Sequence, residues 1–503
     1  MNLSDLMSGV PEAEFSADRD LEIRSLDYDS RRAEPGSLFF AIHGEKADGH
    51  AFIPQALARG AVAIVSERTS PGERAGSPQS PIPWVRVPRI RRALSEASRA
   101  FYSHPEQALC LVGITGTNGK TTTAYLLESI FQAAGLTTGM FGTIEYHVAG
   151  KRLPAVNTTP ESLDLVRNLA LLVRARASMV VMEVSSHALA QERVWGFPFA
   201  AAIFTNLTRD HLDYHQTMAD YFQAKRRLFE GIGAPPPGLA AINTDDPWGL
   251  RLLEMPFARL VTFGMRSDAN VRPKQFSTDA FRIRATFLTP MGPLEIDSEL
   301  TGRPNLMNIM AAVAAAQGLG IGGGVIQQGI QALRHVPGRF ERVEAGQPFL
   351  VVVDYAHTDD ALHNLLTTAR ELTRRRLIVV FGCGGDRDRT KRPLMGEAAG
   401  SLADVVVLTS DNPRSEDPLA IINDALVGVQ KTGKPCILEP DRAAAIHLAL
   451  DLAHDGDLVV IAGKGHETYQ VFKDRTVPFD DREVARQALA SLGYTGSVKL
   501  NRS

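Results

Sequence analysis

The sequence is poor in cysteine. Its 503 residues include only Cys110, Cys383 and Cys436, which are scattered along the chain and lie beside apolar runs. An odd number of dispersed cysteines argues against a disulfide framework and against a zinc site. We therefore expect a protein of a reducing compartment.

The sequence also lacks segments that would direct it to a membrane. Residues 1–5 have neither the basic start nor the apolar core of a signal peptide, and no uninterrupted apolar run reaches about eighteen residues. We expect a cytoplasmic protein with no membrane partner.

An excess of charge of either sign is absent as well. With 54 basic and 57 acidic residues, the formal net charge is −3. This balance gives no electrostatic reason to expect nucleic acid or an anionic membrane as a partner, so any anion must be bound locally. Internal repeats and low-complexity tails are missing too. We expect the protein to be a monomer.

The most informative segment that is present spans residues 113–123 and reads Gly-Ile-Thr-Gly-Thr-Asn-Gly-Lys-Thr-Thr-Thr. An apolar strand is predicted at 109–112 and an amphipathic helix at 125–134, so the segment has the setting of a phosphate-binding loop. Lys120 is placed to reach the terminal phosphates, and the Thr121 hydroxyl to hold Mg²⁺. Ile114 stands where the general pattern has glycine. The alternative is a glycine-rich turn with an unrelated lysine.

The length predicts about three domains of roughly 150 residues each. Residues 1–108 contain short strand-like segments and no phosphate loop. Residues 109–336 alternate strands and helices, with an antiparallel insertion near 281–300 and a helix at 305–318 that ends in a glycine cluster. Residues 337–503 form a second strand–helix series. The predicted fold class is α/β with parallel sheets. Buried strands are predicted at 179–184, 201–205, 239–242, 350–353, 377–381, 405–409 and 458–461.

Polar residues follow several of these strands, where open parallel sheets bind ligands. Glu183 ends the strand that begins at Met179, and His211 lies shortly after the strand that begins at Ala201. Both are candidate Mg²⁺ ligands. For His211, a solvated loop residue is an equal alternative.

These motifs resemble the Mur ligases, ATP-dependent enzymes that add amino acids to the peptide of the bacterial cell-wall precursor. The loop Gly-Thr-Asn-Gly-Lys-Thr-Thr of that family matches residues 116–122, and the resemblance runs nearly end to end. It implies ATP as co-substrate, Mg²⁺ as cofactor, and a carbamoylated lysine at Lys225 that helps to hold a second Mg²⁺. The implied catalytic residues are Lys120, Glu183, His211 and Lys225, and the implied metal ligands are Thr121, Glu183, His211 and Lys225. The implied ATP-binding residues are Gly116, Thr117, Asn118, Gly119, Lys120, Thr121, Thr122, Asn305, Asn308, Arg339 and Asp354.

The first hundred residues resemble the uridine-nucleotide-binding module of this family at 29–31, 35–39 and 48–52. The resemblance implies that the chain binds UDP-N-acetylmuramoyl-L-alanyl-D-glutamate. The turn 157–160, taken alone, is an ordinary turn and helix start. The implied contacts of this substrate are Tyr28, Ser30, Glu45, Lys46, Ala47, Asn157, Thr158, Thr159, Ser185, Gln191 and Arg193.

Three polar turns in the last domain, at 384–388, 411–414 and 462–467, are expected to meet in one crevice. Meso-diaminopimelate differs from lysine by one carboxylate, which a guanidinium such as that of Arg414 can hold with two parallel hydrogen bonds. The alternatives are a surface ion pair of Arg414 with Glu416 or Asp417, and L-lysine as the substrate. The implied diaminopimelate contacts are Arg387, Asp411, Asn412, Pro413, Arg414, Gly463 and Glu467.

The resemblance implies that ATP activates the D-glutamate carboxylate as an acyl-phosphate, which the amine of the amino acid then attacks. We expect the last domain to close about a hinge at 336–339, and Asp359 to cap the helix that follows the segment beginning at Asp354. Rival interpretations are folylpolyglutamate synthase, the related ligase that adds a dipeptide, and a P-loop switch that forms no peptide bond.

Overall fold

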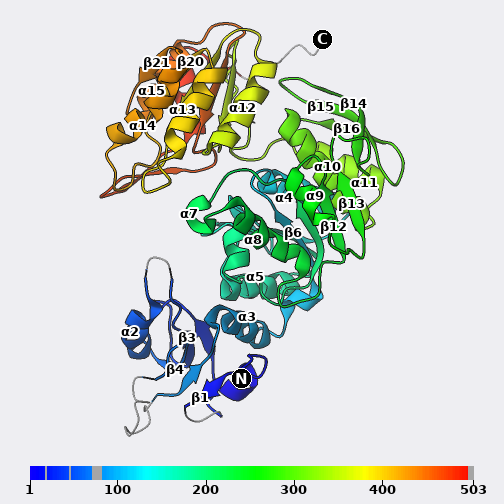
Figure 1. Ribbon diagram of the computed structural model, residues 1–503, viewed down its shortest axis with the longest axis vertical. Helices are drawn as coiled ribbons and strands as arrows, with labels where there is room; N and C mark the ends of the chain where they lie inside the picture. Colours follow the sequence, from blue (N-terminus) through cyan, green and yellow to red (C-terminus); the bar gives the residue numbers. More distant parts are fainter. Residues whose placement is uncertain (17–19, 45–46, 71–81, 497–503) are drawn as a thin grey trace.

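The computed structural model describes residues 1–16, 20–44, 47–70 and 82–496. Figure 1 shows three α/β lobes that follow one another along the chain, with the first lobe at one end of the molecule and the last at the other. Each lobe contains a parallel or mixed sheet with helices packed on it. The predicted fold class is confirmed.

The N-terminal lobe is built on a five-stranded sheet of order β1-β5-β4-β3-β2, in which only β1 is antiparallel. Side chains alternate across β3, so Leu38 and Phe40 join the core under α3, whereas Phe39 packs with Ile64 on the opposite face. The elements are α1 (Leu3–Leu6), β1 (Glu14–Phe15), β2 (Ser25–Asp27), β3 (Ser37–Phe40), α2 (Ile53–Ala58), β4 (Ala61–Ser66), β5 (Trp84–Arg86) and α3 (Ile90–Phe101).

The central lobe has an eight-stranded sheet of order β13-β12-β11-β6-β10-β7-β8-β9. Strand β6 lies between β10 and β11, and helices cover both faces, which explains why these strands read as continuous apolar runs. The sheet and its helices comprise β6 (Cys110–Thr115), α4 (Lys120–Ala133), β7 (Thr138–Phe141), β8 (Glu145–Val148), β9 (Lys151–Pro154), α5 (Ser162–Arg174), β10 (Met179–Glu183), α6 (Ser186–Ala190), β11 (Phe199–Phe204), α7 (Leu212–His215), α8 (Met218–Glu230), β12 (Leu239–Asn243), α9 (Pro247–Leu252) and β13 (Leu260–Phe263).

Helix α4 begins at Lys120, whereas the sequence predicted a start at Tyr125. The first turn is made of Lys120 and three threonines, which do not read as part of an amphipathic helix. Gly119 precedes it with φ of 87°, in the left-handed region that favours glycine. The free N–H groups of this first turn therefore lie in the phosphate loop itself.

The antiparallel insertion is confirmed and is larger than expected. It is a three-stranded sheet, β14 (Arg272–Thr278), β15 (Ile283–Leu288) and β16 (Leu294–Ser298). Strand β14 gave no sequence signal because most of its side chains are exposed. Helix α10 (Arg303–Gly318) matches the predicted helix closely, and α11 (Gly323–Ala332), which the sequence did not predict, begins inside the glycine cluster that follows it.

The C-terminal lobe has a six-stranded sheet of order β17-β18-β22-β19-β20-β21, with only β17 antiparallel. Its four predicted strands agree with the structure to within one residue at each end. The elements are β17 (Glu341–Arg342), β18 (Leu350–Asp354), α12 (Asp359–Leu372), β19 (Leu377–Phe381), α13 (Lys391–Leu402), β20 (Val405–Leu408), α14 (Pro418–Lys431), β21 (Cys436–Leu438), α15 (Arg442–Asp451), β22 (Leu458–Ala462), β23 (Tyr469–Val471), β24 (Thr476–Pro478) and α16 (Asp481–Ser491).

The expected cap of α12 is wrong. Thr358 is the N-cap, and its hydroxyl accepts a hydrogen bond from the Ala361 N–H at 3.2 Å. Asp359 lies in the first turn instead, where its negative charge faces the positive end of the helix. A threonine before two aspartates offers three possible caps, and the sequence alone does not rank them.

The central and C-terminal lobes are joined by the segment that follows α11. Val336 and Arg339 form an isolated bridge there, and Gly338 has φ of 64°. The structure therefore places a tight turn at the predicted hinge. Within the described part of the chain, helices fall short of the length and apolar character needed to cross a membrane.

Candidate functional site

The phosphate loop lies between β6 and α4 and is held from behind by the end of β11. Thr205 Oγ1 donates to the Asn118 carbonyl at 2.7 Å, and the Asn118 N–H donates to Asn206 Oδ1 at 2.9 Å. The Lys120 ammonium folds back on the loop, donating to the carbonyls of Gly116 and Thr117 at 2.9 Å each. This is a preformed cradle with its lysine inside it.

Lys225 reaches the same loop from α8. Its side chain is buried, its Nζ donates to the Gly116 carbonyl at 2.8 Å, and the amine lies 4.6 Å from the centre of the Tyr221 ring. Burial and the nearby Lys120 charge lower the pKa of Lys225 well below its ordinary value. Lys225 therefore belongs to the nucleotide site, although its own sequence context reads as a surface helix.

Glu183 lies at the end of β10 with a buried carboxylate. It accepts from the Thr143 backbone N–H at 2.8 Å and from the Thr143 hydroxyl at 3.0 Å. These two bonds fix the direction of the carboxylate. Thr143 was missed by the sequence argument because it lies in a loop after β7, and only the fold brings that loop beside β10.

His211 lies in the left-handed conformation, with φ of 52°. Its Nε2 is 3.3 Å from Asp210 Oδ2, and its ring centroid is 4.7 Å from that of His187. Burial lowers the pKa of His211 to about 3, although the Asp210 charge opposes the shift. A neutral imidazole is the form that binds metals.

Among the residues that the structure describes, no group of three or more His, Cys, Asp or Glu side chains is arranged to hold a metal ion by itself. Mg²⁺ rarely uses such a cage, since it keeps several waters and takes one or two carboxylates together with substrate phosphates. The buried Glu183 carboxylate and the Thr121 hydroxyl fit that pattern.

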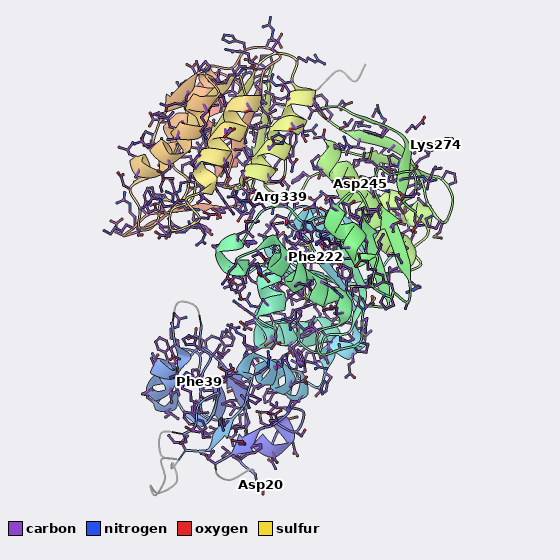
Figure 2. All side chains as sticks on the ribbon, viewed as in Figure 1. Asp20, Phe39, Phe222, Asp245, Lys274 and Arg339 are labelled. Atoms are coloured by element: carbon purple, nitrogen blue, oxygen red, sulfur yellow. The ribbon has the colours of Figure 1, made fainter. Side chains whose placement is uncertain are left out.

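The residues predicted for the far side of the nucleotide lie at the junction of two lobes. The Asn308 side chain donates to Asn305 Oδ1 at 3.2 Å. Arg339 donates to Thr121 Oγ1 at 3.1 Å, and Figure 2 shows it between the C-terminal lobe and the central lobe. Asp354 accepts from two backbone N–H groups at 2.7 and 2.8 Å, and burial raises its pKa. Both lobes therefore contribute to one site.

The predicted contacts for the peptide end of the acceptor come together beside Glu183. Thr159 Oγ1 donates to the Glu183 carbonyl at 2.8 Å and accepts from the Ser185 N–H at 3.0 Å. Arg193 donates to the Thr159 carbonyl at 3.0 Å and to Gln191 Oε1 at 2.8 Å. Asn157 and Thr158 belong to the same loop, where the Asn157 carbonyl accepts from Tyr146 and Thr158 Oγ1 lies 3.1 Å from Thr143 Oγ1.

The predicted nucleotide contacts of the N-terminal lobe are only partly described. The Tyr28 hydroxyl donates to Asp164 of α5, and Ser30 Oγ donates to Gln55 Oε1 at 2.7 Å. Ala47 is exposed, and Glu45 and Lys46 lie outside the described residues. Tyr28 thus joins its lobe to the central lobe.

The polar turns of the C-terminal lobe meet at the carboxyl ends of β19, β20 and β22. Arg414 has φ of 53° and donates to the Gly385 carbonyl at 2.7 Å. Glu416 is held by Arg392 at 2.7 and 3.0 Å, and Asp417 caps α14. The surface ion pair considered for Arg414 is therefore wrong, because both acidic side chains have other roles.

The same crevice holds a compact charged group. Asn412 Nδ2 and Lys464 Nζ donate to Glu467 Oε2 at 2.9 and 3.0 Å, and Gly463 lies against the Asp411 carboxylate. Pro413 lies between Asn412 and Arg414 in the same turn, and Arg387 donates to the Asp386 carbonyl at 3.2 Å. Lys464 was missed as a site residue. A lysine between two glycines at a strand end is the signal that could have found it.

The central and C-terminal lobes also contact each other directly beside the phosphate loop. Lys391 Nζ lies 2.6 Å from Asp210 Oδ1, and Asn118 Nδ2 donates to Asp360 Oδ2 at 3.1 Å. The pKa of Asp210 lies below its ordinary value. Burial alone would raise this pKa, but nearby positive charges such as that of Lys391 lower it by more. The sequence argument missed Asp210, Lys391 and Asp360.

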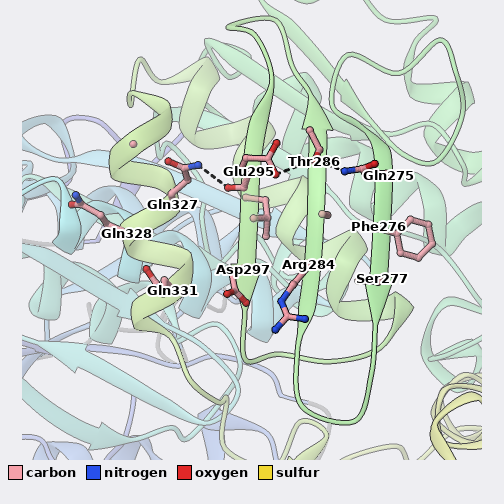
Figure 3. A pocket seen from close by; sticks show the side chains of 13 residues that line it. Gln275, Phe276, Ser277, Arg284, Thr286, Glu295, Asp297, Gln327, Gln328 and Gln331 are labelled. Atoms are coloured by element: carbon pink, nitrogen blue, oxygen red, sulfur yellow. Dashed lines mark hydrogen bonds between the residues drawn. The ribbon is translucent and has the colours of Figure 1, made fainter. Parts of the chain in front are cut away.

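A separate groove of about 800 Å³ lies on the insertion sheet and α11 (Figure 3). Its lining is polar, with Thr286 donating to Glu295 at 3.0 Å and Gln327 donating to the Glu295 carbonyl at 2.8 Å. None of the predicted site residues lines it. We assign it no part in the chemistry.

The structure therefore joins a phosphate loop, a buried carboxylate and a neutral histidine in the central lobe to a crevice of polar turns in the C-terminal lobe, an arrangement that suits an ATP-dependent ligase. Models of the Mur ligase family match three parts of the chain. The model described as Mur ligase family, catalytic domain, covers residues 22–102, the Mur ligase middle domain covers 114–316, and the Mur ligase, glutamate ligase domain, covers 338–465.

Curated relatives extend this match over nearly the whole chain. UDP-N-acetylmuramoyl-L-alanyl-D-glutamate–2,6-diaminopimelate ligase of Solibacter usitatus is 53% identical over 98% of this chain and 99% of its own. The protein of the same name from Geobacillus thermodenitrificans is 45% identical over 97% and 99%. A solved structure with this name has a TM-score of 0.66 and 31% identity, covering 98% of this chain and all of its own. The chain belongs to the Mur ligase family, a family of ATP-dependent ligases.

Proposed function

We propose that the chain joins meso-2,6-diaminopimelate to the D-glutamate of UDP-N-acetylmuramoyl-L-alanyl-D-glutamate, with conversion of ATP to ADP and phosphate. The relatives of this name, which are 45% and 53% identical over nearly the full length, support the reaction. The observation that carries the choice of amino acid is Arg414, whose guanidinium lies at the Gly384–Gly385 turn beside Arg387. Such a guanidinium suits the carboxylate that lysine lacks.

The first step activates the acceptor. A carboxylate is a poor electrophile toward an amine, so its oxygen attacks the γ-phosphoryl group of ATP in line, giving an acyl-phosphate and ADP. Lys120 supplies positive charge at the phosphates, and the N–H groups of the loop and of the first turn of α4 orient them. Arg193, Thr159 and Ser185 hold the peptide end close to Glu183, where the carboxylate must meet the phosphoryl group.

The side chains of Thr121, Glu183, His211 and Lys225 would hold Mg²⁺ when it is bound. The metal supplies charge neutralisation of the phosphoryl oxygens. The buried Glu183 side chain offers carboxylate oxygens, and burial keeps the His211 ring in the neutral form that a metal requires by lowering its pKa.

Lys225 fits this set only after modification. An ammonium repels a metal, but carbamoylation by CO₂ gives an anionic oxygen ligand and releases a proton. The reaction needs a neutral amine, which burial at Lys225 favours by lowering the pKa of the side chain. We propose that Lys225 is carbamoylated in the active enzyme.

The second step forms the amide. The amine of diaminopimelate attacks the acyl-phosphate carbon, the tetrahedral intermediate expels phosphate, and the amine loses a proton. Positioning supplies most of the catalysis, and no protein nucleophile is needed. In our proposal Arg387 and Arg414 hold the far carboxylate of diaminopimelate. Glu467 binds the far ammonium and exchanges its present partner Lys464 for the substrate. The crevice is shaped by Asp411, Asn412, Pro413 and Gly463.

The same proposal assigns the uridine nucleotide to Tyr28, Ser30 and residues 45–47, and the adenosine of ATP to Asn305, Asn308, Arg339 and Asp354. Domain boundaries are proposed at 108/109 and 336/337. We further propose that the enzyme is cytoplasmic and monomeric.

The experiment measures phosphate release and nucleotide-linked product with ATP, Mg²⁺ and the UDP-linked acceptor, with meso-diaminopimelate and L-lysine in parallel. Turnover with diaminopimelate alone is expected, and Arg414→Ala should lower kcat/KM for diaminopimelate about 30-fold by removing charged hydrogen bonds. Arg475→Ala, at an exposed cation of the same lobe, is the control. Preference for lysine would refute the role of Arg414, and turnover with neither amino acid would refute the proposed reaction.

A further inference from the structure

A buried carboxylate, Glu192, lies where the N-terminal lobe and helix α8 meet the turn of residues 191–193, which we call the acceptor turn. It is 6% exposed, and its φ of 58° places it in the left-handed region, which glutamate seldom adopts. Its neighbours in sequence, Gln191 and Arg193, are proposed acceptor contacts, but Glu192 itself has no role in that proposal.

Arg92 of α3 binds Glu192 with both arms of its guanidinium. Nε donates to Oε2 at 2.9 Å and Nη2 donates to Oε1 at 2.7 Å. The same guanidinium lies 3.8 Å from the centre of the Trp195 ring, and Arg89 approaches Oε1 at 3.5 Å. A bidentate, stacked pair of this kind fixes direction as well as distance. It therefore joins α3 of the first lobe to the turn that carries Gln191 and Arg193.

Arg227 approaches Glu192 from the other side. Its guanidinium donates to Glu192 Oε1 at 3.0 Å and to the Leu189 carbonyl at 2.6 Å. Arg227 follows Lys225 on α8 by two residues, and Lys225 contacts the phosphate loop. Glu192 thus connects α3 to the helix that supplies the lysine of the nucleotide site.

Glu161, directly before α5, is a second buried carboxylate that an arginine of α3 binds. Arg91 of α3 donates to Glu161 Oε2 at 2.6 Å, and Arg193 Nε lies 3.5 Å from the same oxygen. Arg91 and Arg92, which are adjacent in α3, therefore bind two carboxylates beside Arg193, one its neighbour in sequence and the other its neighbour in space. Glu161 Oε1 and Arg193 Nε are buried, with no hydrogen-bond partner among the described residues.

The acceptor is a long molecule with a uridine diphosphate at one end and the reacting carboxylate at the other. If each end binds a different lobe, the second contact is intramolecular once the first has formed, and its strength depends on the fixed spacing of the two sites. We propose that Glu192 is a positioning residue that holds the N-terminal lobe and the acceptor turn at the angle that lets one acceptor molecule contact both. This inference rests on the proposed function and assigns a role that the acceptor contacts themselves do not have.

The test compares two acceptors in the full-length enzyme, the UDP-linked one and N-acetylmuramoyl-L-alanyl-D-glutamate without the nucleotide. In Glu192→Gln we expect KM for the UDP-linked acceptor to rise about tenfold, as for loss of a charged hydrogen bond, with kcat and the KM for ATP little changed. The KM for the truncated acceptor should stay the same. The ratio of the KM for the truncated acceptor to the KM for the UDP-linked acceptor should therefore fall.

A second variant guards against misfolding. Arg92→Lys keeps the charge but loses the bidentate geometry, and it should reproduce the effect more weakly. The double variant should show less than the sum of the single effects, because one interaction is lost twice. Glu14→Gln, at an exposed pair with Arg86 in the same lobe, is the matched control and should behave as the parent enzyme.

Two results would overturn the inference. An equal rise of KM for both acceptors would mean that Glu192 only shapes the local turn, and an unchanged KM for the UDP-linked acceptor would mean that it positions nothing. If the parent enzyme shows no advantage for the UDP-linked acceptor, the proposed acceptor is wrong and the inference falls with it. The parent enzyme therefore separates the two failures.

Discussion

The two interfaces of the central lobe differ in where their contacts lie. Toward the N-terminal lobe, arginines of α3 bind the buried carboxylates Glu161 and Glu192, and Tyr28 binds Asp164. Toward the C-terminal lobe, the contacts are Lys391 with Asp210, Asn118 with Asp360 and Arg339 with Thr121. Most of the first set lies outside the reaction site, whereas the second set lies inside it.

This difference indicates what each interface does. Contacts at the second interface use the phosphate loop and its neighbours, so nucleotide and substrates must compete with them or replace them. At the first interface Leu163 of α5 belongs to the apolar core of the N-terminal lobe, whereas the contacts named at the second interface are polar, and polar domain interfaces permit motion. We therefore expect the first two lobes to act as one body and the third to move about the turn at 336–339.

The largest effect is expected where α8 meets the phosphate loop, in the body formed by the first two lobes. Lys225→Ala should lower kcat about 1000-fold, because a proposed ligand that would hold Mg²⁺ at the transferring phosphoryl group is lost. Phosphate release checks the rate, and the intact mass of the parent enzyme should exceed that of the bare chain by one CO₂. Arg226→Ala on the same helix is the control, since Arg226 pairs with Glu230 at 2.9 Å on the surface. Full activity in Lys225→Ala would contradict its assigned role.

The next effect tests the movable interface itself. Arg209 and Thr390 face each other across it at 3.3 Å, so cysteines at both positions can be joined by a short thiol reagent. The cross-link should lower turnover about 100-fold or more by blocking realignment of the reacting groups. The matched control joins Tyr102 to Arg167 across the other interface, where the side chains lie 3.1 Å apart, and it should leave turnover unchanged. An equal loss of turnover in both cross-linked enzymes would contradict the proposed difference between the two interfaces.

A smaller effect concerns the stability of the moving lobe. Arg442 and Asp481 form a fully buried pair at 2.7 Å, and Arg442 also donates to the carbonyls of Ser410 and Ala462 beside the crevice. Asp481→Ala should lower the free energy of unfolding by about 3 to 5 kcal/mol, because it strands a buried charge. Denaturant unfolding measures this. Loss of no more than about 1 kcal/mol, the value of a surface pair, would mean that the pair does not hold the lobe.

The smallest effect is a pH dependence at the fixed interface. Burial raises the pKa of Glu192, but the hydrogen bonds from Arg92 and Arg227 outweigh it, so the net pKa lies below the ordinary 4.5. A carboxyl with a depressed folded-state pKa stabilises the fold above its unfolded-state pKa and loses that contribution as the pH falls through the folded-state value. The Tm difference between the parent and Glu192→Gln should therefore be present at pH 7 and vanish in acid. A difference that persists below the folded-state pKa would contradict this origin.

The sequence predicted the strands better than it predicted the site. Buried parallel strands such as 377–381 are continuous apolar runs and were found to within a residue. The exposed strand β14 and the first turn of α4 were missed, because their side chains carry no periodic apolar pattern.

For the site, the phosphate loop and Glu183 could be read from the chain alone, since a loop motif and a strand end are local signals. Lys225 needed the family resemblance, because its burial arises only when α8 packs against β6. Asp210, Lys391 and Glu192 were not found at all. Each of them acts through partners that are far away in sequence, and such partners are known only from the fold.

The most direct test of the contrast between the interfaces is a pair of distance measurements by single-molecule fluorescence in the full-length enzyme. One pair of labels spans the N-terminal and central lobes, and the other spans the central and C-terminal lobes. On addition of ATP, Mg²⁺ and the UDP-linked acceptor, the second distance should change while the first stays constant. A change in the first distance with none in the second would contradict the account.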